Sequence, residues 1–234
     1  MSAPYLLSDE HLDLFPDVAL ALKEPNGLIA VGGDLSPKRL LAAYSKGIFP
    51  WYSDEQPIMW WSPDPRAILY PDNFKVSRSL QKTLNKNIFH VTFDTAFDDV
   101  ILECAKIRKD GFGTWITEDM MQAYRELHEL GYAHSVECWH EQKLVGGLYG
   151  LSLGHAFFGE SMFTRKTDAS KVALAYLVQQ LKAWQFDFID AQVSSEHMKS
   201  LGATDIPRRQ FIHELQQTLK LSSRIGCWHF DYNN

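Results

Sequence analysis

The segment 146–170, GGLYGLSLGHAFFGESMFTRKTDAS, constrains the fold more than any other part of the chain. It reads as two β-strands joined at a tight Leu-Gly-His turn. The second strand carries a carboxyl group, Glu160, among aromatic and sulfur-containing side chains. An ionised carboxyl group is costly to bury unless it is paired or has a task. The segment therefore predicts a β-hairpin with an acid at a candidate site.

A further apolar strand is expected over residues 186–193 (FDFIDAQV). Side chains alternate between the two faces of a strand, so Asp190 and Gln192 are expected on the same face. If this strand lies beside the one that carries Glu160, the three polar side chains come together. They are the candidate catalytic residues of the chain.

The order of elements predicts an α/β (α+β) fold. After residue 93 the pattern gives helix, helix, three strands, helix, strand and helix, at residues 94–108, 117–130, 133–139, 143–151, 155–161, 169–184, 186–193 and from 207 onward. The first 65 residues are rich in Pro, Gly and Trp, with one short helix expected over residues 37–46. We expect a small N-terminal domain at residues 1–65, or extending to about 95, and a catalytic domain at residues 96–234 with a mixed sheet flanked by helices.

Composition excludes several classes of protein. The formal net charge of −6 excludes a nucleic-acid-binding protein that is basic overall, so any contact with nucleic acid must come from a local patch. The three cysteines, Cys104, Cys138 and Cys227, match neither a zinc site nor a disulfide framework. We find no signal peptide and no apolar window of the roughly 18 to 20 residues that span a bilayer. We therefore expect a cytoplasmic protein without a membrane contact, and, since nothing calls for an interface, a monomer.

A basic stretch stands out from this acidic background. Its cations are Arg66, Lys75, Arg78, Lys82 and Lys86. The last three follow one another at intervals of four, which places them on one face of a helix. Such a run is either a solvated helix face or a surface that contacts phosphate groups. The Trp-rich segment 48–65 before it is likewise either a rigid covering loop or a surface on which a ligand stacks.

The order of helices and strands suits acyltransferases of the acetyltransferase type, but the acyl donor is not expected to be a coenzyme A thioester. Enzymes of that type hold the pyrophosphate with a Gly-rich turn at a helix N-terminus. The corresponding segment here, TRKTDASK, contains no glycine, and Asp168 would repel an anion there.

Several long blocks of sequence resemble one family. They include GLIAVGGDLSPKRLLAAYSKGIFPWY, MWWSPDPRAIL, TWITEDMMQAYRELHELGYAHSVE, GGLYGLSLGHAFFGESMF and LGATDIPRR. In the same order, over residues 15–219, they resemble the leucyl/phenylalanyl-tRNA–protein transferases. The resemblance implies an acetyltransferase-like catalytic domain without metal or cofactor. It also implies transfer of leucine or phenylalanine from aminoacyl-tRNA to proteins that begin with arginine or lysine, which creates a signal for degradation.

The resemblance also implies roles for particular residues. A pocket for the donor side chain is expected from Leu148, Phe157, Met162, Leu174, Leu177 and Ile189. Apolar pockets discriminate weakly by size, so methionine is expected as a donor as well. Trp51 and Trp115 are expected to hold the terminal adenosine of the tRNA, and Arg66, Arg78, Lys82 and Lys86 its phosphates. Each of these residues could instead serve the core or a solvated surface.

The chemistry leaves the proton path open. An aminoacyl ester is already activated, so the protein must align an amine, manage one proton and stabilise an oxyanion. Asp190 with Gln192 as partner could relay the proton, or the ribose 2′-hydroxyl could carry it while both residues only position groups. Glu160 is expected to bind the α-ammonium group of the donor.

Three other functions remain consistent with the sequence. They are an acyl-CoA acetyltransferase, which would need the missing Gly-rich turn, an RNA-binding module without activity, and a transferase with changed acceptor specificity.

Overall fold

The computed structural model describes residues 3–8, 10–109 and 115–230 of the chain. In these residues the strands form a four-stranded sheet in the order β1-β2-β4-β3 and a seven-stranded sheet in the order β11-β5-β10-β9-β8-β7-β6. The strands of the smaller sheet are Tyr5–Leu6 (β1), Leu28–Val31 (β2), Phe49–Pro50 (β3) and Met59–Trp61 (β4). Those of the larger sheet are Arg66–Leu69 (β5), His90–Phe93 (β6), Ala133–His140 (β7), Lys143–Leu153 (β8), Ala156–Thr164 (β9), Phe188–Gln192 (β10) and Thr204–Ile206 (β11).

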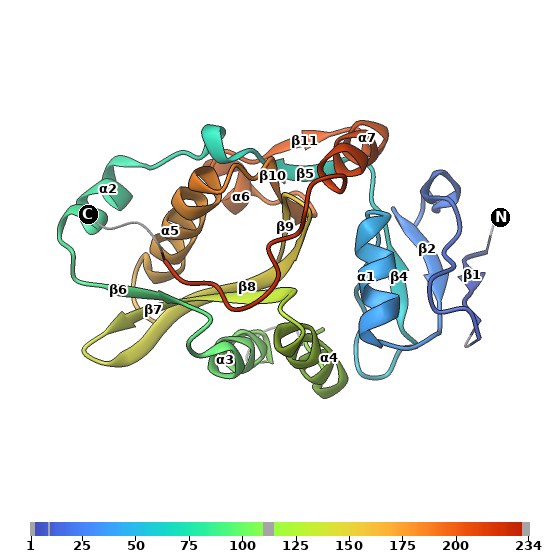
Figure 1. Cartoon of the computed structure of the whole chain (residues 1–234), viewed down its shortest axis with the longest axis horizontal. Helices are drawn as coiled ribbons and strands as arrows, with labels where there is room; N and C mark the ends of the chain where they lie inside the picture. The colour runs from blue at the N-terminus through green and yellow to red at the C-terminus, as the bar shows by residue number, and fades with distance from the viewer. Residues whose placement is uncertain (1–2, 9, 110–114, 231–234) are drawn as a thin grey trace.

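The N-terminal unit packs one helix against the smaller sheet (Figure 1). Helix α1 (Pro37–Ser45) has proline in its first turn, where no intrahelical N–H bond is lost, and the chain leaves it through Gly47 at φ +72°. Trp60 is fully buried, and its indole nitrogen donates to the Gly32 carbonyl at 2.9 Å. A buried tryptophan with a satisfied N–H fixes this small core.

Helices cover both faces of the larger sheet (Figure 1). Helices α3 (Phe97–Lys109) and α4 (Glu118–Glu129) lie on one face, and α5 (Ala169–Ala183) lies on the other. The remaining helices are the 3-10 helices η1 (Val18–Leu20) and η2 (Pro71–Asn73) and the α-helices α2 (Arg78–Asn85), α6 (Glu196–Ser200) and α7 (Arg208–Thr218). The predicted mixed α/β architecture, a small N-terminal unit and a mixed sheet flanked by helices, is confirmed.

Strands β9 and β10 run side by side for only part of their length. They pair in parallel from Phe188↔Ala156 to Asp190↔Phe158, and β9 then continues alone on this side to Thr164. The crossover between them is α5, as expected for parallel neighbours. The divergence of the two strands leaves unpaired backbone and an opening in the sheet.

The helices and strands expected after residue 93 all form, with ends that differ by a few residues. In that part of the chain the sequence did not indicate the short elements α6 and β11. Before residue 70 it indicated α1 and none of the strands β1 to β5. Because β5 and β6 belong to the seven-stranded sheet, the predicted catalytic span 96–234 omits two of its strands. We propose a domain boundary near residue 65, between β4 and β5.

Two glycines of this sheet give a paired test of its packing against α5. A Cβ at Gly146 on β8 would lie 2.5 Å from the Cβ of Ala169, at the start of α5. A Cβ at Gly159 on β9 would have no neighbour closer than 3.7 Å. We expect Gly146→Ala to lower the free energy of unfolding by about 1 to 3 kcal/mol through overpacking. Gly159→Ala should be neutral or stabilising by less than about 1 kcal/mol. Urea unfolding of both variants measures this, and equal losses would contradict the packing described.

Candidate active site

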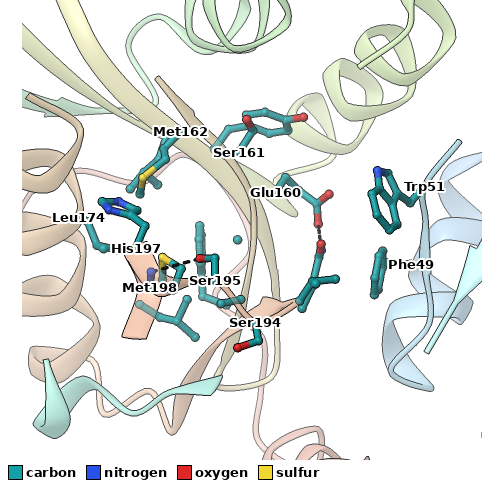
Figure 2. Close-up of a pocket in the computed structure, with 18 of the residues that line it drawn as sticks. Phe49, Trp51, Glu160, Ser161, Met162, Leu174, Ser194, Ser195, His197 and Met198 are labelled. Carbon is teal, nitrogen blue, oxygen red and sulfur yellow. Dashed lines mark hydrogen bonds between the residues drawn. The ribbon is translucent and has the colours of Figure 1, made fainter. Parts of the chain in front are cut away.

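A cavity of about 350 Å³ opens where β9 and β10 diverge. One wall comes from α5 and the segment through α6, and the opposite wall comes from β3 and the loop after it in the N-terminal unit (Figure 2). The apolar end lies near Leu174 and Met162, and Glu160 lies between that end and Trp51. The cavity therefore has a mostly apolar interior with the His197 ring at its edge, one carboxyl group and an aromatic rim, which suits a ligand with an apolar side chain and a polar group beside it.

Most of the residues that the sequence suggested for the site meet in this cavity. All six members of the predicted side-chain pocket line it, namely Leu148, Phe157, Met162, Leu174, Leu177 and Ile189. The lining also includes the predicted residues Glu160, Gln192, Trp51 and Trp115. Residues that the sequence did not single out complete it, among them Phe49, Tyr149, Ser161, Ser195, His197 and Met198.

Glu160 is the polar centre of the cavity and accepts hydrogen bonds from two other elements. Its Oε1 accepts the Tyr44 hydroxyl of α1 at 2.6 Å and the Nε2 amide of Gln192 at 2.8 Å. The Tyr44 hydroxyl in turn shares a hydrogen bond with the hydroxyl of Tyr124 from α4. Glu160 is only 9% exposed, and its burial raises the pKa of the carboxyl group to about 7 although Tyr44 and Tyr124 oppose that rise. This carboxyl group can therefore change charge near neutral pH.

Asp190 does not line the cavity but forms a buried ion pair with Arg66 of the neighbouring strand β5. Nε and Nη2 of Arg66 donate to Oδ1 and Oδ2 of Asp190 at 2.8 and 2.7 Å, and both side chains are fully buried. The Arg66 guanidinium also donates to the Gly47 carbonyl at 3.1 Å and lies between the rings of Phe49 and Phe211. The pair therefore joins the larger sheet to the segment that carries β3.

A bulge in β10 brings Gln192 to Glu160. The pairing with β5 shifts between Asp190 and Gln192, and the backbone of Gln192 has φ +62°. The Gln192 N–H donates to Asp190 Oδ1 at 2.8 Å, which holds this left-handed conformation in place. The prediction that Asp190 and Gln192 share one face of a regular strand is therefore wrong. Asp190 faces Arg66, while Gln192 reaches Glu160.

Two tryptophans stand at the rim on the side of the N-terminal unit. The rings of Trp51 and Trp115 lie 6.1 Å apart at an angle of 82°, and Trp51 is 40% exposed. The Trp51 carbonyl accepts the indole N–H of Trp61 at 2.7 Å, which fixes the loop. An exposed, fixed indole beside a cavity is a surface on which a nucleobase can stack.

The basic stretch divides into two parts. Arg78, Lys82 and Lys86 lie on or directly after α2 and are exposed, so they can meet a ligand. Arg66 was also expected to contact tRNA phosphates, and the structure corrects this. Its guanidinium is fully buried against Asp190, so no phosphate can reach it.

Asp168, at the N-terminus of α5, is held by two neighbouring side chains. Asp168 has φ +66°, and its carboxylate accepts the Thr83 hydroxyl of α2 at 3.0 Å and pairs with Lys171 at 3.2 Å. In the described part of the chain, no cluster of three or more His, Cys, Asp or Glu side chains could hold a metal ion. Nor is any helix there both long and apolar enough to cross a membrane.

The ion pair generates a prediction about stability. Removing one partner leaves the other charged and buried, which costs about 3 to 5 kcal/mol. We expect this loss for Arg66→Met and for Asp190→Leu, and a smaller loss for the double variant than for the two single variants added together. Urea unfolding of all three proteins measures these values. Additive losses would show that the two side chains do not depend on each other.

Glu160 generates a prediction about pH. Its pKa rises from 4.5 to about 7 on folding, so the folded state binds this proton more tightly than the unfolded state. The stabilisation is therefore present at low pH and is lost as the pH rises through about 7. Relative to Glu160→Gln, the free energy of unfolding of the natural protein should fall by about 2 kcal/mol between pH 5 and pH 8. Parallel stability curves for the two proteins would contradict the assigned shift.

Known proteins resemble this chain along nearly its whole length. The family model described as leucyl/phenylalanyl-tRNA protein transferase matches residues 68–216, and the model of the N-terminal domain of that family matches residues 33–64. The leucyl/phenylalanyl-tRNA–protein transferase of Nitrosospira multiformis is 53% identical over 229 residues, which cover 98% of this chain and 97% of that protein. The transferase of the same name from Cellvibrio japonicus is 59% identical over 197 residues, 84% of each chain.

Solved structures show a weaker likeness. A GCN5-related N-acetyltransferase from Kribbella flavida is 10% identical with a TM-score of 0.38, over 72% of this chain and 60% of that one. The structure of L-PGS from Bacillus licheniformis is 12% identical with a TM-score of 0.40, over 87% of this chain and 68% of that one. The two matched family models and the identity to curated relatives place the chain in the leucyl/phenylalanyl-tRNA–protein transferase family.

Proposed function

We propose that this aminoacyltransferase moves leucine or phenylalanine, and also methionine, from aminoacyl-tRNA to the α-amino group of proteins that begin with arginine or lysine. The new N-terminal residue then marks the acceptor for degradation. The observation that carries the proposal is the order of groups along the cavity: an apolar end, then the Glu160 carboxyl group, then an aromatic rim. That order matches the order of groups in an aminoacylated adenosine: side chain, amine, ester and base.

In this proposal the apolar end of the cavity binds the donor side chain. Leu174 and Leu177 of α5 and Phe157 of β9 line that end, and the cavity of about 350 Å³ is large enough for a single side chain and its ester. An apolar pocket separates side chains by only ~1 to 3 kcal/mol per methylene group. Leucine, phenylalanine and methionine are therefore all accepted, and charged side chains are excluded because they would lose their hydration.

Glu160 binds the donor amine. Its Oε1 already accepts Tyr44 and Gln192, so these two residues orient the carboxylate toward the cavity. A bound ammonium group favours the ionised carboxylate, which offsets the rise of the Glu160 pKa caused by burial. Without donor, Glu160 ionises near pH 7, so kcat/KM for leucyl-tRNA, which reports the free protein, should rise with pH through about 7.

Asp190 acts as a positioning residue in this account. Both of its oxygens accept bonds from Arg66, and Oδ1 accepts the Gln192 N–H as well. A carboxylate that is fully buried and occupied in this way is poorly placed to take a proton from the acceptor amine. The ribose 2′-hydroxyl of the donor is then the better candidate to carry the proton, with Gln192 orienting the reacting groups.

The tRNA contacts two surfaces, the rim of the cavity beside the N-terminal unit and helix α2. Its terminal adenine stacks at Trp51 and Trp115, and its phosphates meet Arg78, Lys82 and Lys86. Both structural units of one chain line the cavity, so a monomer suffices for the reaction. Because aminoacyl-tRNAs are made and used in the cytoplasm, the proposal places the reaction there.

The test is the transfer of radiolabelled leucine from leucyl-tRNA to a peptide that begins with Arg, with a peptide that begins with Val as the control. We expect labelling of the Arg peptide only, and about a hundredfold loss in Gln192→Ala if that side chain orients the reacting groups. A protein that binds leucyl-tRNA and labels neither peptide would favour an RNA-binding module. Labelling of peptides with acidic N-termini would indicate changed acceptor specificity.

The basic row on α2 gives a separate prediction. Each phosphate contact adds about −0.9 to the slope of log K against log salt for binding to a duplex. Lys82→Gln should therefore weaken the binding of leucyl-tRNA and make this slope shallower by about one. The matched control is Lys143→Gln, because Lys143 is an exposed lysine at the start of β8 outside α2 and the cavity lining. Equal slopes for the two variants would remove α2 from the tRNA surface.

A further inference from the structure

The last described part of the chain crosses the larger sheet after α7. We call residues 219–230 the C-terminal strap; Figure 1 shows it as the red trace that runs from α7 past β8 toward α5. Three hydrogen bonds attach it to separate loops. Ser223 Oγ accepts the Gly154 N–H at 2.8 Å, the Gly226 N–H donates to the Gly131 carbonyl at 3.1 Å, and the Trp228 N–H donates to Asp94 Oδ2 at 2.6 Å.

Trp228 is the residue of the strap that enters the core. It is 2% exposed, and its indole N–H donates to the Arg224 carbonyl at 3.1 Å. Its ring stacks on His134 at 3.7 Å between centroids and 9° between planes. It also meets the rings of Trp184 and Phe186 at 4.9 and 5.9 Å. With its backbone and its ring both held, the indole has little freedom to move.

Trp228 also touches a wall of the cavity from behind. Its ring lies 6.0 Å from the ring of Phe157, which lines the cavity, whereas Trp228 itself does not. Gly150 supports Phe157 from the neighbouring strand β8, where a Cβ would come within 2.6 Å of the Phe157 ring. The Phe157 ring therefore sits against glycine backbone and the indole, and it cannot retreat from the cavity while both stay in place.

We propose that Trp228 is a specificity-determining residue that limits the depth of the donor pocket through Phe157. It does so without touching the donor. A donor side chain larger than phenylalanine, such as tryptophan, would have to push Phe157 into the space that the indole fills. The inference rests on the proposed function, because it takes the cavity to be the site of the donor side chain.

The test compares two donors in the same protein preparation. Replacing Trp228 by leucine removes most of the indole volume and lets Phe157 move back. We expect Trp228→Leu to raise the ratio of kcat/KM for tryptophanyl-tRNA over leucyl-tRNA by about tenfold, the scale on which apolar pockets discriminate by size. Trp228→Phe, which keeps more of the ring, should give a smaller rise in the same direction. A fraction of unfolded protein cancels in this ratio, so a loss of stability alone would leave it unchanged.

The matched control is Phe230→Leu in the same strap. Phe230 packs against Phe93 at 5.6 Å and Tyr176 at 5.1 Å, and neither of these lines the cavity. This variant should lose stability but keep the donor ratio of the natural protein. A rise in Phe230→Leu equal to that in Trp228→Leu would overturn the proposal, because it would show a general loosening of the strap.

The remaining outcomes separate this inference from the proposed function. If the natural protein transfers leucine and neither Trp228 variant changes the donor ratio, the role of Trp228 is refuted while the transferase function stands. Loss of transfer from every donor in both Trp228 variants would also refute it, because the account requires leucine still to bind. A natural protein that transfers no leucine at all would refute the proposed function first.

Discussion

The site depends on one buried ion pair, Arg66–Asp190. It joins β5 to β10, and the same guanidinium reaches the Gly47 carbonyl of the segment that carries β3. Buried pairs contribute little net stability, because removing two charges from water costs about as much as their attraction returns. What this pair supplies is geometry. It holds the Gln192 N–H, and with it the bulge that points Gln192 at Glu160.

The cavity joins two structural features that meet at Glu160. The divergence of β9 and β10 makes room for an apolar side chain, and the buried Tyr44 of the N-terminal unit donates a hydrogen bond to Glu160. Neither unit has the whole candidate site, so the docking of α1 and β3 against the larger sheet is needed to form the cavity. Trp228 adds a third component from the end of the described chain, which supports the cavity wall at Phe157.

Local patterns predicted the elements that are long and periodic, and long-range contacts decided the rest. Helix 117–130 and the three strands from residue 133 follow from capping residues and alternation. The sequence also indicated Glu160 and Gln192, which line the cavity, but it placed Asp190 with them, and Asp190 lies outside the lining. Arg66 was misread because a basic stretch looks alike in sequence whether its first residue is on the surface or inside β5. Tyr44 and Tyr124 carry no local signal at all, because 80 residues separate two side chains that meet only in the folded chain. The bulge at Gln192 likewise depends on Asp190 and Arg66, which are 124 residues apart.

The most direct measurement is a crystal structure with a non-hydrolysable donor analogue, an adenosine that carries leucine through a 3′-amide. The account predicts the leucine side chain against Leu174 and Phe157, its ammonium group within hydrogen-bonding distance of Glu160, and the adenine at Trp51 and Trp115. An analogue that binds elsewhere, or that turns its ammonium group away from Glu160, would contradict the central claim that this cavity binds the donor amino acid.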